Sequence, residues 1–463
     1  MSDLAADIII VGAGVTGCAA AVALADGQRR ILVLEARTGH KPRFAGELIH
    51  PTGAQVLDDL GFLPTLRRHG GVDVQGFAVL RSLTHDALRL PYDEIPDNRP
   101  TGFAMEHRDL VEGMREVMRA TPGVELRMGH KVDELLRDAR GRICGVRCGD
   151  TRLHAHLVLG CDGRHSKIRP LLGLAEQARL LSFSVAFRLP MGGPILPCPG
   201  FGHIILGAWG PMLVYPIGGP QGARDARGCF DVTSDLSGGP RGAADLLRRE
   251  YAPHLPPALR QAMLESLDRE PPQIAANEAI RTDRAVLPGA AIVGDAGGCS
   301  HPLTAAGMTV GFSDAQRLGR LLAPLQRLGD ADRVDAVLRD YEVQRYRFVR
   351  AREILADALY EVFRGADPGT RAIREGIIRY WQGSAHARGQ SMALLSGADS
   401  RLGVFIREYL TVVRQSGAAA LSARGERRAA LTGLGRKSLE KMSIVLRDVR
   451  QETARTLMAR TAQ

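Results

Sequence analysis

The stretch DIIIVGAGVTGCAAAVALADGQRRILVLEAR, residues 7–37, decides the fold. An apolar segment ends in a glycine-rich turn, an alanine-rich segment follows, and a second apolar segment ends at Glu35. The order strand, turn, helix and strand is that of a βαβ unit. The sequence therefore predicts an α/β (α+β) fold that begins with a Rossmann-like unit.

The turn holds Gly12, Gly14 and Gly17 in the spacing G-x-G-x-x-G, which is typical of dinucleotide-binding sites. The first glycine permits the tight turn, the second lets the backbone approach a pyrophosphate, and the third lets helix and strand pack closely. The N-terminus of the helix presents N–H groups and a partial positive charge to the phosphates. Glu35, 18 residues after Gly17, is suited to ribose hydroxyls. These features indicate a site for NAD or FAD.

A second glycine-rich stretch, GDAGGCSHPLTAAGMTVGFSDA at residues 294–315, favours FAD. It follows an apolar segment, so Asp295 is expected at a strand end, where its carboxylate can bind ribitol hydroxyls. A helix is expected to begin near Ala306, and its N-terminus would face the edge of a flavin ring that becomes negative on reduction. The small residues Ala305, Ala306 and Gly307 would let the backbone lie against that ring. NAD needs no such second site.

Two strand-rich blocks interrupt the βαβ framework, and a helical region follows it. Residues 75–95 and 181–235 alternate apolar and polar side chains between turns, which predicts an inserted antiparallel sheet. From Ser313 onward the spacing of apolar residues is helical, with a long run near residues 331–363. We expect three parts, namely an FAD-binding domain of residues 1–74, 99–178 and 278–365, a substrate domain of residues 75–98 and 179–277, and a C-terminal helical region with a basic tail at residues 366–463.

The composition is that of a globular protein of 463 residues, with 45% hydrophobic and 24% charged residues. The N-terminal residues show no secretion signal, and no apolar run reaches the roughly 18 residues of a membrane-spanning helix. The seven cysteines are scattered without a C-x-x-C pair, which favours a reducing compartment and gives no metal site. We therefore expect a cytoplasmic protein.

Most of the net charge of +10 lies near the C-terminus. Residues 401–463 hold 13 Arg and Lys against 5 Asp and Glu, a net charge of +8. Such a tail suits nucleic acid, an anionic membrane surface or solvent. It has one aromatic pair, Phe405 and Tyr409, and no nucleic-acid recognition motif, so we expect no nucleic acid partner. Peripheral contact with a membrane and a solvated or oligomer-facing helix both stay open.

From these motifs the chain resembles the FAD-dependent monooxygenases of the p-hydroxybenzoate hydroxylase type. Besides the two glycine-rich stretches it carries their middle motif, GCDGRHSKIR at residues 160–169, with Asp162 and Gly163. Within that class it is most similar to the squalene epoxidases, through AGELIHPTGAQVLDDLGF at residues 45–62 and HPLTAAGMTVGFSD at residues 301–314. The resemblance covers nearly the whole chain.

The resemblance implies FAD as the cofactor, with NADPH or NADH as the electron donor, either directly or through a reductase partner. No second glycine-rich nucleotide fold is visible in the sequence, which does not decide between these two routes. The cofactor-binding residues that the motifs and the resemblance imply are Gly12, Gly14, Val15, Thr16, Gly17, Glu35, Ala36, Arg37, Arg43, Arg108, Val132, Asp162, Gly163, Gly294, Asp295, Pro302, Ala305, Gly307 and Met308.

The implied reaction is epoxidation or hydroxylation of a hydrophobic small molecule (terpenoid, polyketide-like or aromatic), with O2 as co-substrate and a flavin C4a-hydroperoxide as oxygen donor. An isolated alkene needs no catalytic base, because the flavin drives the reaction. We assign no catalytic residue and name His301 and Tyr92 as the candidates. Two alternatives stay open: a flavin-dependent reductase of prenyl double bonds, and a flavoprotein without turnover. Substrate contacts are expected from Phe77, Tyr92, Phe187, Ile204 and Tyr215 on the predicted sheet.

The chain departs from the squalene epoxidase pattern at three places. Ala305 and Ala306 replace glycines of the family, and Phe77 stands where the family has a tyrosine. The family's C-terminal helices are apolar and seated in a membrane, whereas here they carry charges such as Arg407 and Arg414. The charged helices argue against tight membrane anchoring and against squalene itself as the substrate, whereas the two alanines should still admit a flavin ring.

Overall fold

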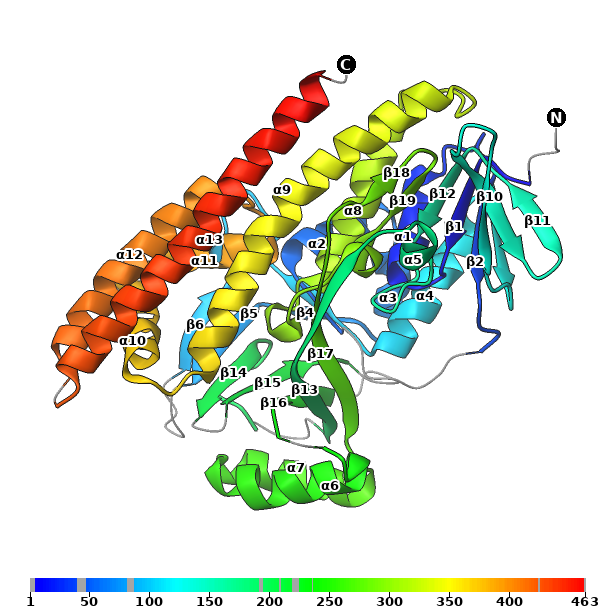
Figure 1. Ribbon diagram of the computed structural model, residues 1–463. Coiled ribbons are helices and arrows are strands. Elements are labelled where there is room, and N and C mark those ends of the chain that lie inside the picture. The colour runs from blue at the N-terminus through cyan, green and yellow to red at the C-terminus, as the bar shows by residue number, and fades with distance from the viewer. Residues whose placement is uncertain are drawn as a thin grey trace.

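The computed structural model describes residues 5–39, 47–80, 87–190, 195–207, 210–218, 225–234, 236–423 and 425–461. Figure 1 shows a sheet with its helices built mainly from the N-terminal part of the chain, and a second sheet, in green, beside it. Long helices from the C-terminal third run along the other side. The predicted α/β (α+β) class is confirmed.

The apolar segments of the βαβ unit form the centre of a six-stranded sheet with the order β18-β19-β12-β1-β2-β8. β1 lies parallel to β2 and β12, β8 extends the parallel set on one side and β19 on the other, and β18 is antiparallel. All residues of β1 are buried, so both faces of the sheet are covered there. The strands are β1 (Ile8–Val11), β2 (Ile31–Glu35), β8 (Val124–Met128), β12 (Leu157–Gly160), β18 (Val286–Leu287) and β19 (Ala290–Ile292).

Helices from several separate regions of the sequence pack into the same apolar core as this sheet. The first follows the glycine turn directly, which confirms the predicted βαβ unit, and the last begins at Gly307, next to the predicted start at Ala306. These two helices pack against each other. The set comprises α1 (Val15–Leu24), α2 (Pro51–Asp59), α3 (Leu63–Arg68), α4 (His107–Ala120), α5 (Ile168–Leu171) and α8 (Gly307–Leu322).

Two small antiparallel sheets of three strands each complete this part of the molecule. One has the order β11-β10-β9, with β9 (Glu134–Arg137), β10 (Ile143–Cys148) and β11 (Thr151–His154). The other has the order β3-β7-β4, with β3 (Leu48–Ile49), β4 (Val72–Val74) and β7 (Gly102–Ala104).

The two strand-rich blocks, together with residues 273–282, which were not predicted as a strand, form one seven-stranded sheet with the order β17-β13-β16-β15-β14-β5-β6. Its strands are β5 (Gly76–Leu80), β6 (Ala87–Pro91), β13 (Glu176–Pro190), β14 (Gly202–Gly207), β15 (Gly210–Pro216), β16 (Asp225–Val232) and β17 (Gln273–Thr282). The expectation of a wholly antiparallel sheet was wrong at one pair, because β14 lies parallel to β5. A parallel pair needs a long connection, and here the chain passes through the other sheets between these two strands.

Side chains alternate between the two faces of the seven-stranded sheet. Phe77, Ile204 and Tyr215 lie in one apolar cluster, whereas Phe187 and Ile205 lie in another. The second cluster is covered by α6 (Gly239–Leu246) and α7 (Pro257–Arg269), two helices that the sequence analysis did not predict. In Figure 1 these helices lie below the sheet. A π-helical turn and a 3-10 turn, η3 (Leu247–Tyr251) and η4 (Ala252–His254), connect them.

The C-terminal part is helical, as predicted, and covers the face with Phe77 and Tyr215. Side chains of Asp330, Asp367 and Ser384 accept hydrogen bonds from the first turns of three of these helices, which explains where they begin. Within the described ranges, no helix is long and apolar enough to cross a membrane. The boundaries of the three-part division stay a prediction. The helices are α9 (Ala331–Arg364), α10 (Pro368–Gly383), α11 (Ala385–Ser396), α12 (Leu402–Leu421) and α13 (Arg427–Thr461).

Candidate functional site

The three glycines of the first glycine-rich turn differ in the space that is available for a Cβ atom. Gly12 has a φ of +105°, and a Cβ atom there would lie 2.6 Å from the carbonyl oxygen of Cys161. A Cβ atom at Gly17 would lie 1.8 Å from the carbonyl oxygen of Gly12. At Gly14, by contrast, a Cβ atom would meet none of the described atoms within 4 Å. The protein's own packing thus requires Gly12 and Gly17, while the space beside Gly14 fits a pyrophosphate at the helix N-terminus.

Glu35 lies beside this turn at the end of β2. Its carboxylate accepts hydrogen bonds from the backbone N–H groups of Ala13, at 3.0 Å, and Arg37, at 3.1 Å. The backbone N–H of His130 donates to the Glu35 carbonyl at 2.9 Å, which brings the segment that leads to Val132 to the same strand end. Ala36 and Arg37 are exposed. From this strand end the residues could reach the ribose and adenine end of a dinucleotide.

The middle motif follows β12, the neighbour of β1. The Asp162 carboxylate accepts hydrogen bonds from the Ser166 hydroxyl at 2.7 Å and from the backbone N–H groups of Lys167 and Ile168 at 2.6 and 3.1 Å. Gly163 has a φ of +78°. Asp162 therefore holds the start of α5 in place, which is a structural role beside the predicted contact with a pyrophosphate.

The second glycine-rich stretch meets the first through Thr16. Gly294 has a φ of +62°, and a Cβ atom there would lie 2.9 Å from the Thr16 hydroxyl oxygen. A Cβ atom at Gly311 would lie 2.3 Å from the same oxygen. Asp295 is half-buried, and its Oδ1 lies 3.3 Å from a Cβ position at Gly307. Both stretches follow parallel strands of one sheet, β1 and β19, and lie at the carboxyl ends of these strands, where open α/β sheets bind ligands.

Residues 302–308, which lead into α8, form a partly exposed surface at this edge, and we call this surface the seat. Ala305 has a φ of +49°, in the left-handed region, and is half-buried, while Gly307 and Pro302 are exposed. Met308 is half-buried in the first turn of α8. The helix N-terminus carries partial positive charge. The small side chains and the helix start together fit a flat ring that becomes negative on reduction.

His50, which the sequence analysis missed, lies under this seat. Its side chain is fully buried, with Nε2 2.7 Å from the carbonyl oxygen of Thr304 and Nδ1 2.8 Å from the hydroxyl of Tyr92. The ring of Phe77 lies 6.1 Å from that of His50 and 6.2 Å from that of Tyr92. The signal available in the sequence was its place in the family-like segment at residues 45–62, directly before α2.

His301, a candidate general acid, has both ring nitrogens engaged. Nδ1 accepts from the backbone N–H of Leu303 at 3.1 Å, while Nε2 lies 3.0 Å from the Ser182 hydroxyl and 3.2 Å from the Asp231 carboxylate. The ring stacks on Tyr360 at 4.2 Å. Burial is the largest single influence on the Asp231 carboxyl and works against its ionisation, but the hydrogen bonds from His301 and Ser182, together with the positive charge of Arg364, lower its pKa. This arrangement gives His301 a structural place beneath the seat.

The structure brings four of the predicted substrate residues together and leaves one apart. Phe77, Tyr92, Ile204 and Tyr215 share one buried apolar cluster, which also includes Leu303 and residues of the C-terminal helices such as Trp381 and Met392. Phe187 lies on the opposite face of the sheet, with its ring 6.0 Å from that of Phe230. The apolar cluster therefore joins the ring seat to the sheet without Phe187.

Two predicted cofactor-binding arginines remain. Arg108 lies in the first turn of α4 and its side chain is exposed. Arg43 lies outside the described residues.

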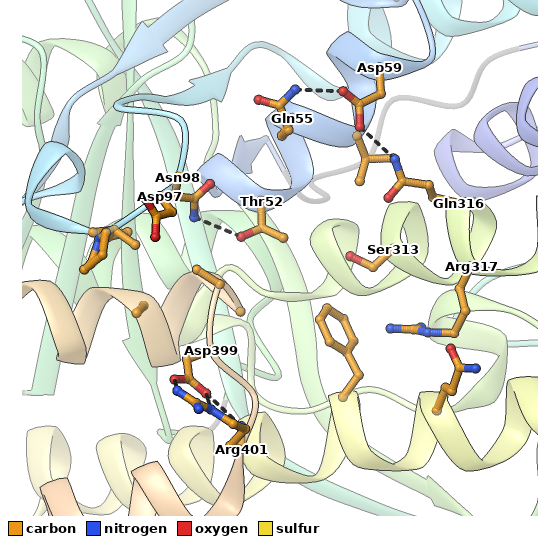
Figure 2. A pocket seen from close by; sticks show the side chains of 18 of the residues that line it. Thr52, Gln55, Asp59, Asp97, Asn98, Ser313, Gln316, Arg317, Asp399 and Arg401 are labelled. Atoms are coloured by element: carbon orange, nitrogen blue, oxygen red, sulfur yellow. Dashed lines mark hydrogen bonds and ion pairs between the residues drawn. The ribbon is translucent and has the colours of Figure 1, made fainter. Parts of the chain in front are cut away.

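A polar cavity of about 770 Å³ lies between α2, α8, α9 and α11 (Figure 2). Gln55 and Gln316 each donate a hydrogen bond to Asp59, and Arg401 pairs with Asp399 on its wall. The residues that line it include none of those predicted from the sequence for the cofactor or the substrate. We therefore locate the candidate site at the glycine-rich edge of the sheet and not in this cavity.

Comparison with solved structures supports the fold. The p-nitrophenol 4-monooxygenase PnpA from Pseudomonas putida DLL-E4 matches with a TM-score of 0.68 and 20% identity, over 88% of this chain and 98% of that one. PqsL of Pseudomonas aeruginosa, described as a probable FAD-dependent monooxygenase, matches with a TM-score of 0.66 and 23% identity, over 78% of this chain and 96% of that one.

Comparison with sequences shows the family. A family model for FAD dependent oxidoreductases matches residues 7–90, and a family model for squalene epoxidase matches residues 154–431. Squalene epoxidase erg1 of Aspergillus fumigatus is 31% identical over 390 residues, which cover 81% of this chain and 79% of that protein. Squalene epoxidase 3 of Arabidopsis thaliana is 31% identical over 403 residues, which cover 85% of this chain and 75% of that protein. With its glycine-rich edge, its ring seat and these matches, the chain belongs to the squalene epoxidase family of FAD-dependent monooxygenases.

Proposed function

We propose that the chain inserts one oxygen atom from O2 into a hydrophobic small molecule, as an epoxidase or a hydroxylase. The observation that carries this proposal is the common edge of one sheet at which the open space beside Gly14 and the seat at Gly307 lie, next to a buried apolar cluster. FAD, when bound, supplies the electrons that activate O2 and the transfer of oxygen. The chain's own residues would bind and orient the cofactor and keep water from the reacting atoms.

The proposed cofactor would lie along this edge with its phosphates at the N-terminus of α1. Glu35 would accept hydrogen bonds from the ribose hydroxyls and Asp295 from the ribitol hydroxyls. The N-terminus of α8, at Gly307, would face the part of the ring that becomes negative on reduction. Each of these groups lies at the end of a strand or at the start of a helix, which supports the assignment.

The substrate would lie between the seven-stranded sheet and the C-terminal helices. Phe77, Ile204 and Tyr215 line the sheet side of that cluster, and the Tyr215 hydroxyl is already bound to Glu47 at 3.1 Å. Such a surface favours an alkene or aromatic compound without charge, such as a terpenoid or a polyketide-like metabolite. The names of the relatives point to squalene, an alkene of this apolar class. An alkene requires no catalytic base, which agrees with the structural places of His301 and Tyr92.

NADPH or NADH would supply the electrons, received directly or through a reductase. The consumption of each nucleotide by the purified chain, with and without an added flavin reductase, separates these routes. Consumption without a reductase would support direct transfer.

The function is tested by incubating the reduced protein with a lipid and metabolite extract under ¹⁸O-labelled oxygen. A product that gains one labelled oxygen atom supports a monooxygenase. A product that gains two hydrogens instead would support a reductase of prenyl double bonds. A flavin-containing protein that consumes no NAD(P)H, even with a reductase present, would support a flavoprotein without turnover.

We also propose that α12 and α13 make peripheral contact with an anionic membrane from the cytoplasmic side. Leu410 and Leu421 are exposed at helical spacing on α12, as are Leu431, Leu439 and Leu446 on α13. Basic side chains of the same two helices are exposed, so charge and apolar surface combine as in surface-bound helices. Among the described side chains of these helices, the exposed basic residues are Arg407, Arg414, Arg427, Arg428, Arg436 and Arg447.

Sedimentation with vesicles tests this contact. The chain should bind vesicles that contain phosphatidylserine more strongly than vesicles of phosphatidylcholine alone, and salt should weaken the binding. Leu439→Gln combined with Leu446→Gln should reduce the bound fraction. Equal recovery with both vesicle types would contradict the proposal.

A further inference from the structure

We propose that His50 and Tyr92 act as the positioning pair of the flavin seat, with His50 anchoring the Thr304 carbonyl and Tyr92 orienting His50. The inference rests on the proposed cofactor site and goes beyond it, because it assigns a role to two side chains that would lie behind the seat. It also changes the expectation for Tyr92, which the sequence presented as a candidate catalytic residue.

The geometry fixes the direction of both hydrogen bonds. The Thr304 carbonyl can only accept, so the proton of the imidazole lies on Nε2, which donates at 2.7 Å. Nδ1 of the neutral ring can only accept, so the Tyr92 hydroxyl donates to it at 2.8 Å. The chain of donors therefore runs from Tyr92 through His50 to Thr304.

Burial keeps both members of the pair neutral. Burial lowers the pKa of His50 from 6.5 to about 4, a bond to the Thr304 carbonyl opposes this, and the cation Arg352 lowers it further. Burial also raises the pKa of Tyr92 well above its ordinary value. With its single proton directed at Nδ1, Tyr92 has none to give to a substrate, so we assign it a positioning role.

The anchored carbonyl belongs to the turn that forms the seat. Thr304 precedes Ala305, whose φ of +49° is unfavourable for a residue with a Cβ atom. The backbone N–H of Ala305 donates to the Pro302 carbonyl at 2.8 Å, and α8 begins two residues later. The hydrogen bond from His50 to the Thr304 carbonyl is the second one in this turn. It would hold the turn in its strained conformation and thereby set the direction of the N-terminus of α8.

The pair also links three separate segments of the chain. Tyr92 follows β6 in a 3-10 turn, η1 (Tyr92–Glu94), His50 directly precedes α2, and Thr304 precedes α8. The backbone N–H of Tyr92 donates to the carbonyl of Gln75 at 2.8 Å, beside β5 of the seven-stranded sheet. Through this pair the sheet that would hold the substrate reaches the seat that would hold the ring.

Three substitutions separate this role from general stability. His50→Leu removes both hydrogen bonds, and Tyr92→Phe removes the donor to Nδ1 and leaves that nitrogen buried without a partner. His50→Gln keeps both bonds, since an amide offers a donor for Thr304 and an acceptor for Tyr92. His203→Leu is the matched control, because His203 is also buried with a pKa of about 4 but lies opposite Val214, a residue of the apolar cluster on the other face of the sheet.

Binding of FAD to the apoprotein, the flavin midpoint potential and the visible spectrum are the measurements. We expect His50→Leu to weaken FAD binding by about tenfold or more and to change the potential, with Tyr92→Phe intermediate. His50→Gln should restore binding to near the wild-type value, and His203→Leu should leave binding and potential unchanged. If His50→Leu fails to fold, His50→Asn takes its place, because its shorter amide cannot reach both partners.

These measurements distinguish a failure of the proposed function from a failure of the positioning pair. A wild-type chain that binds no FAD would refute the proposed function, and this inference would fall with it. A wild-type chain that binds FAD, with a folded His50→Leu variant of equal affinity, potential and spectrum, would overturn the positioning pair alone. Equal weakening by His203→Leu would also overturn it, because the effect would then come from the loss of any buried histidine.

Discussion

The guanidinium of Arg227 donates two hydrogen bonds to the carboxylate of Glu47, at 2.8 and 3.0 Å, and both side chains are buried. Arg227 lies on β16, while Glu47 directly precedes β3. The pair therefore ties the seven-stranded sheet to the segment that leads into α2, next to His50. A hydrogen bond from Tyr215 to the same carboxylate, at 3.1 Å, completes the group.

Removal of one partner from this pair should be costly. Arg227→Met leaves a buried carboxylate without its cation, and we expect the free energy of unfolding to fall by about 3–5 kcal/mol. Urea denaturation measures this change. The matched control is Arg68→Met, since Arg68 and Glu116 form an ion pair with 63% and 51% of their side chains exposed, and we expect a much smaller loss there because water screens the pair. Equal losses in the two variants would contradict the assignment.

Substitutions at two glycines of the first glycine-rich turn should affect folding and cofactor binding separately. Gly17→Ala would place a Cβ atom 1.8 Å from the Gly12 carbonyl oxygen, so this variant should lower the unfolding temperature strongly. Gly14→Ala meets no described atom within 4 Å, so it should fold normally and lose FAD because its methyl group occupies the space of the pyrophosphate. Thermal unfolding followed by circular dichroism, together with flavin absorbance, checks both. A Gly14→Ala variant that retains FAD would refute the proposed phosphate position.

Features with local signals could be predicted from the sequence. The βαβ unit, the start of α8 near Ala306 and the helical C-terminal part each follow from glycine spacing or apolar periodicity within one segment. The strands of the seven-stranded sheet other than β17 were predicted for the same reason, because apolar and polar residues alternate between turns in residues 75–95 and 181–235. These predictions needed no knowledge of distant contacts.

Features that depend on distant contacts could not be predicted in this way. The partners of His50 lie 42 and 254 residues away in the sequence, so nothing beside it marks the two hydrogen bonds. The parallel pairing of β14 with β5 depends on the path of the chain between them. The register of β13 in the sheet decides on which face Phe187 lies. A shift of the register by one residue would move this side chain to the other face.

Asp295 and Asp162 should respond differently to the loss of their carboxylates. Asp295→Ala removes the proposed acceptor for the ribitol hydroxyls, so the purified variant should lose its FAD and its visible flavin absorbance. Asp162→Ala removes an acceptor for the first N–H groups of α5, so we expect a loss of about 1 kcal/mol in stability and a smaller effect on the cofactor. An unchanged flavin spectrum in Asp295→Ala would contradict our assignment.

Acid should destabilise the fold through its buried neutral histidines. Burial, the largest cause, lowers the pKa values of both His50 and His203 from 6.5 to about 4. Between these values the unfolded chain binds a proton at each position and the folded chain does not, so the free energy of unfolding falls as the pH drops from 6.5 to 4. For each histidine the loss of unfolding free energy that is reached at pH 4 is of the order of 3 kcal/mol.

Glutamine at either position removes the titrating group, and therefore each single variant should show a smaller fall in stability between pH 6.5 and pH 4 than the wild-type chain. Urea denaturation at several pH values within this window measures the change of the free energy of unfolding with pH.

The binding of FAD at pH 4.5 and at pH 7 should distinguish the two variants. His203→Gln should bind like the wild type at both values, because His203 lies far from the seat in the chain and faces the other side of the sheet. His50→Gln should retain its affinity at the lower pH better than the wild type, because the wild-type imidazole begins to gain a proton there and then loses its ability to accept the bond from Tyr92. A wild-type chain whose free energy of unfolding stays constant between pH 6.5 and pH 4 would show that His50 and His203 are not held neutral in the folded protein.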